Sequence, residues 1–303
     1  MLDEEIAAVL LTDAQAPSPL DPQSLPLMRQ AMSQVGQTLP APDVVCVAHL
    51  AGAIPLRLYK PVGASPAGLP LLVFLHGGGW VLGNLESHDA PCRLLADRAQ
   101  CAVLAVDYRL APEHPFPAAL DDCAVAFRWA VDHAEGLGCD PARIAVGGES
   151  AGANLAAALA IAVRDRGGVQ PAFQFLVHPA TDLTLNQPSI DAVGFAGLTR
   201  SFLEKVIRMY ADGRDLADPL LSPLRCQDLA GLPRAFVYTV EVDPLRDDGE
   251  CYAIALAQAD VEVTVRRLAG LPHGFMFLPV SLSAVDRAFD LLAVSLAAAF
   301  RHL

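Results

Sequence analysis

Positive charge is scarce in this sequence. Its 303 residues include 34 aspartates and glutamates but only 21 lysines and arginines, so the formal net charge is −13. No cluster of basic residues interrupts this acidic balance. Nucleic acid and anionic membrane surfaces attract basic patches, so the charge pattern argues against both as partners. The field of the chain instead favours neutral or cationic small molecules.

The sequence also lacks the patterns of disulfide-rich, metal-binding and membrane-spanning chains. Its seven cysteines are odd in number, form no CxxC pair and do not cluster with histidines at metal-ligand spacing. The longest apolar runs, near residues 153–163 and 291–300, are too short to span a bilayer. The first five residues are acidic where a signal peptide would be basic. We therefore expect a cytoplasmic protein with reduced cysteines.

What the sequence does contain is an alternation of strand-like and helix-like segments, with 53% hydrophobic residues to build a core. Short apolar runs predict strands over 44–49, 55–59, 71–75, 102–106, 143–146, 173–177, 235–240 and 261–267. Apolar spacing of three and four predicts helices over 90–100, 118–133, 151–166, 246–258 and 283–300. This order predicts an α/β fold with a mostly parallel eight-stranded sheet and helices on both faces.

Two regions stand outside this alternation. Residues 1–42 are helix-prone and broken by prolines, and residues 183–214 separate two strands by more than an ordinary crossover. The second region contains a helix-like stretch over 200–212. Long insertions after strands commonly form lids or binding loops. We expect both regions to form a helical cap, with 43–182 and 215–303 as the catalytic domain.

The sharpest local motif is Gly148-Glu149-Ser150-Ala151-Gly152, which matches the G-x-S-x-G nucleophile elbow. In that turn the serine projects above the sheet, and the flanking positions must be small because a Cβ would collide with neighbouring backbone. A predicted strand precedes the motif and an alanine-rich helix follows it, as the elbow requires. Alone the pentapeptide is weak, since a Gly-Ser helix cap is an ordinary alternative.

A second motif, His76-Gly77-Gly78-Gly79-Trp80, directly follows the predicted strand 71–75. Three glycines expose backbone N–H groups that can stabilise an oxyanion, and the N–H of Ala151 is a further donor. A phosphate loop or a plain turn is the alternative, but a phosphate loop would require a following lysine. We interpret His76 as structural, holding the loop through hydrogen bonds.

A serine nucleophile needs a base, and His273 has the right position among the eight histidines. It lies in a short loop after the last predicted strand, beside Gly274. Asp243 follows the strand 235–240 at the same sheet edge and can orient the histidine. Glu241 stays an alternative acid, because alternation along an extended chain gives both side chains one direction. The order Ser150, Asp243, His273 is that of α/β hydrolases.

From about Pro55 onward the sequence resembles the bacterial hormone-sensitive-lipase-like esterases, the HGGG branch (family IV) of the α/β-hydrolase superfamily. The resemblance rests on motifs in the family's order, namely His76–Trp80, Asp107–Glu113 with Phe116–Ala119, Gly148–Gly152 with Asn154-Leu155, Asp218-Pro219, Ser222–Leu224, Asp243–Asp247 and His273–Phe275. Three positions depart from it, with Glu149 for the common Asp, Ala153 for Gly, and His178 for Tyr.

The resemblance implies Ser150 as nucleophile, His273 as general base and Asp243 as the orienting acid. It implies an oxyanion hole from the N–H groups of three residues, Gly78, Gly79 and Ala151. It further implies a homodimer through the last strand and helix. Structural support is expected from four residues, and these are His76, Glu149, Arg109 and Glu113.

These features together predict a carboxylesterase that acts on short- to medium-chain esters through an acyl-enzyme, without a metal or organic cofactor. Four apolar side chains near the motifs could line its pocket, namely Trp80, Phe195, Leu198 and Phe202. The alternative is that they pack ordinarily between cap and core. An amidase or deacetylase on the same triad is the second hypothesis. A third is a non-catalytic binder, as in plant gibberellin receptors, which resemble this family but lack the histidine found here as His273.

Overall fold

The computed structural model describes residues 1–12, 20–65, 67–193 and 198–303. The predicted pocket residue Phe195 lies outside these residues. Within them, eight strands form one sheet in the order β1-β2-β4-β3-β5-β6-β7-β8. The strands are β1 (Val44–Ala51), β2 (Ile54–Pro61), β3 (Leu69–Leu75), β4 (Ala102–Val106), β5 (Cys139–Glu149), β6 (Gln174–Val177), β7 (Ala235–Val242) and β8 (Val263–Pro272). Only the β1–β2 and β2–β4 pairs are antiparallel, which confirms the predicted, mostly parallel sheet.

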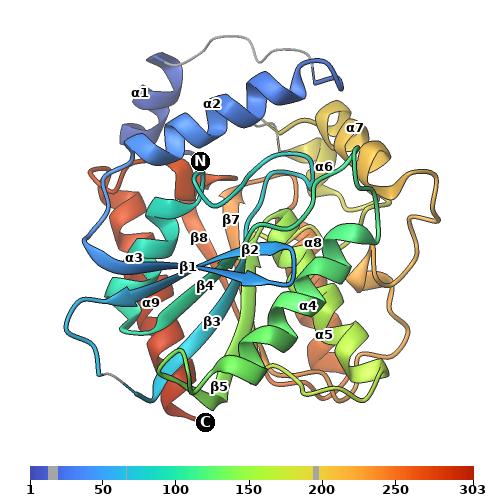
Figure 1. Cartoon of the computed structure of the whole chain (residues 1–303). Coiled ribbons are helices and arrows are strands. Elements are labelled where there is room, and N and C mark those ends of the chain that lie inside the picture. Colours follow the sequence, from blue (N-terminus) through green and yellow to red (C-terminus); the bar gives the residue numbers. More distant parts are fainter. Residues whose placement is uncertain (13–19, 66, 194–197) are drawn as a thin grey trace.

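Helices cover both faces of this sheet, as predicted (Figure 1). On one face α3 and α9 pack on Leu72 and Phe74 of β3, and on the other α4, α5 and α8 belong to the core that includes Leu71 and Val73. The alternation along β3 thus divides the core between two layers of helices. These helices are α3 (Asp89–Ala99), α4 (Ala118–His133), α5 (Ala151–Asp165), α8 (Arg246–Gln258) and α9 (Ser283–Arg301).

Helix α5 is surrounded by protein along most of its length. All twelve residues from Ala151 to Ala162 are buried, and seven of them are alanines. Short side chains let the helix approach the sheet and its neighbour α4 closely. The start of α5 is therefore held in place by packing on every side, which fixes the position of the preceding residue, Ser150.

The remaining helices lie outside the sandwich, and α2 and α7 lie at the same end of the sheet (Figure 1). They are α1 (Glu4–Thr12), α2 (Leu25–Thr38), α6 (Ser189–Ala192) and α7 (Arg200–Ala211), with two 3₁₀ turns, η1 (Pro223–Arg225) and η2 (Phe275–Phe277). The predicted helix over 200–212 corresponds to α7. Among the described residues, no helix is both long and apolar enough to cross a membrane.

Candidate active site

Ser150 occupies a sharp turn between β5 and α5. Its backbone has φ 54° and ψ −121°, a conformation that non-glycine residues rarely adopt. The Ser150 N–H donates to the carbonyl of Val177 at 2.9 Å. A Cβ at Gly152 would lie 1.9 Å from the carbonyl oxygen of Leu75, so this position requires glycine. The turn has the conformation of the nucleophile elbow that the G-x-S-x-G pattern predicts.

His273 and Asp243 continue from Ser150 in a line of contacts. The His273 Nε2 lies 2.9 Å from the Ser150 Oγ, and its Nδ1 lies 3.0 Å from the Asp243 Oδ2. Asp243 is fully buried, and its Oδ1 accepts from the N–H of Leu245 at 2.8 Å. The backbone N–H of His273 donates to Val242 at the end of β7. The loops after β7 and β8 thus bring the three predicted residues together.

Burial and charge act in opposite directions on His273. Burial lowers its pKa, whereas the Asp243 carboxylate, through its charge and hydrogen bond, and the charge of Glu149 raise it. The two carboxylates outweigh the burial, so the pKa of His273 lies above its ordinary value. This environment makes the imidazole a better proton acceptor than a free one.

The glycine run after β3 lies beside Ser150. Gly78, Gly79 and Ala151 line one cavity together with Ser150 and His273. Gly78 has φ 111°, and a Cβ there would lie 2.4 Å from the carbonyl oxygen of Leu82. Only glycine fits this backbone, so the run shapes a loop whose main chain faces the serine.

A buried carboxylate lies under the site. One oxygen of Glu149 lies 3.0 Å from the Nε2 of His88, whose Nδ1 in turn lies 2.8 Å from the Ser87 hydroxyl. The other oxygen lies 3.5 Å from the Nε2 of His178, and the His178 ring centroid is 4.3 Å from that of His273. Glu149 and His178 are noticeable in the sequence as departures from the family pattern. His88 belongs to no motif, so only the fold reveals its contact.

The protonation of this cluster follows from its surroundings. Burial raises the pKa of Glu149, but the His88 hydrogen bond and the neighbouring imidazoles outweigh it and bring the pKa to about 2. Burial, with the adjacent His273, lowers the pKa of His178 to about 4. Near neutral pH the structure therefore contains an ionised carboxylate beside a neutral imidazole.

Comparison with known proteins identifies the family. A family model described as alpha/beta hydrolase fold matches residues 72–277. Carboxylic ester hydrolase LipN of Mycobacterium tuberculosis is 44% identical over 264 residues, which cover 82% of this chain and 70% of LipN. Ethyl acetate hydrolase of Pseudomonas putida is 40% identical over 255 residues, which cover 82% of this chain and 79% of that hydrolase. A solved ester hydrolase from the metagenome of Lake Arreo, complexed with a derivative of bipyridine phosphonate, has 40% identity and a TM-score of 0.90, with 99% of both chains covered.

The chain belongs to the hormone-sensitive-lipase-like carboxylesterases of the α/β-hydrolase fold. It is accordingly a serine hydrolase of carboxylic esters, which confirms the family and enzyme class predicted from the motifs.

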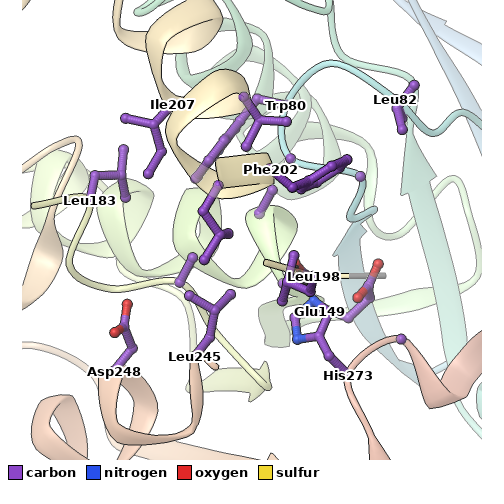
Figure 2. Close-up of a pocket in the computed structure, with 18 of the residues that line it drawn as sticks. Trp80, Leu82, Glu149, Leu183, Leu198, Phe202, Ile207, Leu245, Asp248 and His273 are labelled. Atoms are coloured by element: carbon purple, nitrogen blue, oxygen red, sulfur yellow. Dashed lines mark hydrogen bonds between the residues drawn. The ribbon is translucent and has the colours of Figure 1, made fainter. Parts of the chain in front are cut away.

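The cavity of this carboxylesterase has a volume of about 220 Å³ and a mostly apolar lining. Three of the predicted pocket residues, Trp80, Leu198 and Phe202, line it. Figure 2 shows His273 and Glu149 at one end of the cavity, with Asp248 and Leu183 at the other. Trp80 stacks on Tyr210 of α7 with ring centroids 4.5 Å apart. The lining also includes side chains of α2 and α7, among them Met32, Leu203, Val206 and Ile207.

The other predicted supporting residues lie around the glycine loop of the carboxylesterase. His76 stacks on Tyr108 at 4.1 Å, and its Nδ1 lies 2.8 Å from the carbonyl oxygen of Gly77. Burial lowers the pKa of His76 to about 3, which keeps the ring neutral. Arg109 donates to the buried carboxylate of Asp122 through its backbone and side chain. Glu113 pairs with Arg29 of α2 at 2.8 Å.

Glu241, the alternative acid, has other contacts. Its Oε2 accepts from the N–H of Gly270 at 2.9 Å, on the neighbouring strand β8. The Oδ2 of Asp243, in contrast, contacts the imidazole of His273. The two acids thus differ in their partners, although they lie two residues apart.

Proposed function

We propose that this carboxylesterase acts through a triad in which Ser150 is the nucleophile, His273 the general base and Asp243 the orienting acid. The observation that carries the proposal is the line of contacts from Ser150 Oγ to His273 Nε2 at 2.9 Å and from His273 Nδ1 to Asp243 Oδ2 at 3.0 Å. This arrangement moves one proton between serine and imidazole while the aspartate fixes the imidazole tautomer.

In the first half of the reaction, the Ser150 hydroxyl attacks the carbonyl carbon of the ester and His273 Nε2 takes its proton. The oxyanion of the tetrahedral intermediate accepts hydrogen bonds from the backbone N–H groups of Gly78, Gly79 and Ala151. One donor of this kind typically contributes about 3–4 kcal/mol to stabilisation of the transition state. The C–O bond to the alcohol then breaks, and the alcohol leaves with the proton from His273.

In the second half, His273 takes a proton from water, which attacks the acyl carbon bound to Ser150. The second tetrahedral intermediate uses the same oxyanion donors. Its collapse breaks the bond between the acyl carbon and Ser150 Oγ, and the serine regains its proton from His273. The products are the carboxylic acid and the free enzyme. Each step uses only groups of this chain, the ester and water.

The cavity supports short- to medium-chain esters as substrates. Its volume of about 220 Å³ lies below the roughly 300–1,000 Å³ common among ligand pockets. The apolar side chains Leu198 and Phe202 line the same cavity as Ser150 and limit the space for an acyl chain. A relative of 40% identity is named ethyl acetate hydrolase, which agrees with a small acyl group. Residues 1–42 and 183–214 would form the cap that encloses the acyl chain, because α2 and α7 contribute to the lining.

A fluorophosphonate probe tests the nucleophile. Attack by Ser150 Oγ on phosphorus displaces fluoride, so the protein mass rises by one phosphonyl group. We expect one adduct on Ser150 in the wild type, no adduct in Ser150→Ala, and an unchanged adduct in the control Ser201→Ala on the exposed side of α7. A wild type that takes no label would favour the non-catalytic binder.

A substrate panel then separates the remaining alternatives. Matched esters and amides with acyl chains of increasing length are compared by kcat/KM. Faster turnover of acetate and butyrate esters than of long-chain esters or amides is expected. A preference for the amide series would indicate an amidase, and a preference for long acyl chains would contradict the inferred pocket size.

A further inference from the structure

Three buried or nearly buried side chains with metal-ligating atoms meet beneath the proposed nucleophile. They are Glu149, His178 and His273, and one ligand atom from each lies within 4.8 Å of those of the other two. Glu149 and His178 are fully enclosed, and His273 exposes only 10% of its side chain. The proposed mechanism uses His273 as the base, and Glu149 acts on it only through its charge. Acyl transfer itself does not require the ligand atoms of all three residues to face one point.

His178 differs from an ordinary core histidine. Neither of its ring nitrogens has a hydrogen-bond partner among the described residues, although the ring is completely buried. A buried polar group without a partner is costly, and such a group commonly has a ligand or functional reason. The backbone of His178 is also in the left-handed region, at φ 35°, and is held there by a hydrogen bond from its N–H to Tyr238. The ring is therefore held between Glu149 and His273.

The spacing of two of the ligand atoms fits a transition-metal ion, and the third lies close enough to join them. A tetrahedral Zn²⁺ with bonds of about 2.0–2.2 Å places its ligand atoms roughly 3.4 Å apart. The Glu149 Oε2 and His178 Nε2 lie 3.5 Å apart without any ion. Two histidines and a carboxylate are a ligand set that zinc and related divalent ions prefer. A small movement of the His273 ring would complete three protein ligands, with a water as the fourth.

We propose that Glu149, His178 and His273 form an inhibitory binding site for Zn²⁺ and similar divalent transition-metal ions. This inference rests on the proposed function of His273 as the base. Coordination of its Nε2 removes the lone pair that accepts the Ser150 proton, and coordination of its Nδ1 displaces Asp243. Either way the bound ion stops acyl transfer without any covalent change, and removal of the ion restores the enzyme.

The ion would enter through the substrate cavity. Glu149 and His273 both line that cavity, so two of the three ligands face the path that the ester takes. Zinc and ester therefore compete for one space. The site also depends on a position at which this sequence departs from the family pattern, because His178 stands where the family more commonly has tyrosine.

The first experiment titrates ZnCl₂ into the wild type and into His178→Phe during hydrolysis of a short-chain nitrophenyl ester. We expect reversible inhibition of the wild type that is competitive with the ester and is removed by a chelator. In His178→Phe the inhibiting concentration rises at least about tenfold, because loss of even an outer-shell partner costs that much metal affinity. His133→Gln, which removes an exposed histidine on α4, serves as the matched control and keeps the wild-type sensitivity. Equal inhibition of the wild type and His178→Phe would overturn the proposal.

The second experiment measures binding without turnover. Ser150→Ala retains all three ligands, and calorimetric titration with ZnCl₂ should show one site that is lost in Ser150→Ala/His178→Phe. Should the phenylalanine variant fail to fold, Ser150→Ala/Glu149→Gln replaces it and should lose the same site. Absence of zinc binding to Ser150→Ala refutes the metal site, whereas inactivity of the wild type towards esters refutes the proposed function instead.

Discussion

Asp243 and Glu241 lie two residues apart at the end of β7, yet their carboxylates have different partners. Alternation along an extended strand would point both side chains in the same direction. From the sequence alone, either residue could therefore be the acid that orients His273. The register between β7 and β8 shifts between Val240 and Val242. Such an irregularity re-aims the side chains that follow it. Asp243 consequently contacts His273, while Glu241 accepts from Gly270.

Replacing the acid tests this assignment. We expect Asp243→Asn to lower kcat by about 10⁴-fold, because the amide holds His273 in the wrong tautomer. Circular dichroism should show an unchanged fold, since asparagine has nearly the same shape. Glu241→Gln serves as the control and should retain nearly full activity. A greater loss in Glu241→Gln than in Asp243→Asn would move the assignment to Glu241.

Glu149 predicts a specific pH effect. Its negative charge stabilises the imidazolium form of His273 and so raises the pKa of that residue. The base must be neutral to accept a proton, and activity is lost as the pH falls through this pKa. Glu149→Gln removes the charge, lowers the pKa of His273 and should move the acidic limb of the kcat/KM profile to lower pH.

The profile is compared with that of Glu135→Gln, which removes an exposed carboxylate after α4. That control should leave the acidic limb in place. A merely structural role for Glu149 would reduce activity at all pH values alike, and an upward shift of the limb would contradict the electrostatic account.

Among the elements, α2 contacts the segment that follows the glycine loop chiefly through Arg29, and Asn84 Nδ2 also donates to the hydroxyl of Ser33 on α2 at 2.8 Å. Arg29 donates through Nε to the carbonyl of Val81 at 2.8 Å and through Nη2 to the carbonyl of Ala111 at 2.9 Å. The same guanidinium pairs with both oxygens of Glu113. A helix far away in the sequence thus stabilises the segment that follows the predicted oxyanion donors.

Arg29→Ala should weaken this junction. Loss of the donors leaves two partly enclosed carbonyls unpaired, so we expect a decrease of about 1–3 kcal/mol in the free energy of unfolding. KM should rise as well, because α2 contributes Met32 to the cavity. Chemical denaturation and steady-state kinetics measure both effects. Glu113→Gln should lower the free energy of unfolding by only about 0–1 kcal/mol, since this exposed ion pair is screened by solvent. Equal losses of stability in the two variants would disprove the role of the carbonyl contacts.

For elements with a strong apolar periodicity, the sequence predicts the first and last residue correctly. The structure has β4 at 102–106, α4 at 118–133 and α8 at 246–258, as the apolar patterns predict. The last strand was predicted at 261–267 but runs over 263–272, because pairing with β7 continues beyond the register shift as far as Pro272. Likewise β5 was predicted to begin at 143 but begins at Cys139. Cys139 pairs with Leu69 of β3, and the register between these two strands shifts between Leu69 and Leu71.

The candidate site was predictable where a motif marks it, and elsewhere it was not. Ser150, Asp243 and His273 each follow a strand within a recognisable local pattern, and parallel strands bring such positions to one edge. The contacts of Arg29 and His88 depend on packing between segments that are distant in sequence. No local pattern encodes them, so they become visible only in the fold.

At the scale of the whole molecule, the sheet ends in an edge strand. The side chains from Thr264 to Arg267 on β8 are exposed, and Val265 exposes 51% of its surface. An exposed edge offers unpaired backbone groups to another chain, and a twofold axis would pair β8 with its copy. The homodimer expected from the family resemblance stays a prediction that this edge makes testable.

Sedimentation equilibrium should give twice the chain mass of 32.0 kDa. Val265→Asp should shift the protein to the monomer, because a charge would be placed in the joined edge. Val62→Asp, at an exposed valine directly after β2 and away from β8, should leave the mass unchanged. A wild type that sediments as a single chain at all concentrations would rule out the dimer.

The enclosure of α5 has a consequence for altering this enzyme by laboratory evolution. A library that randomises positions from Ala151 to Ala162 would contain many destabilised variants, because all twelve positions are buried and larger side chains at the alanines would overpack the core. Helix α7 offers the opposite situation, since Phe202, Leu203 and Val206 line the cavity while the other side of the helix, with Ser201, Glu204, Lys205 and Arg208, is exposed. Diversity confined to α7 should therefore yield new acyl preferences at a high frequency of folded clones, with the central helix left as the invariant scaffold.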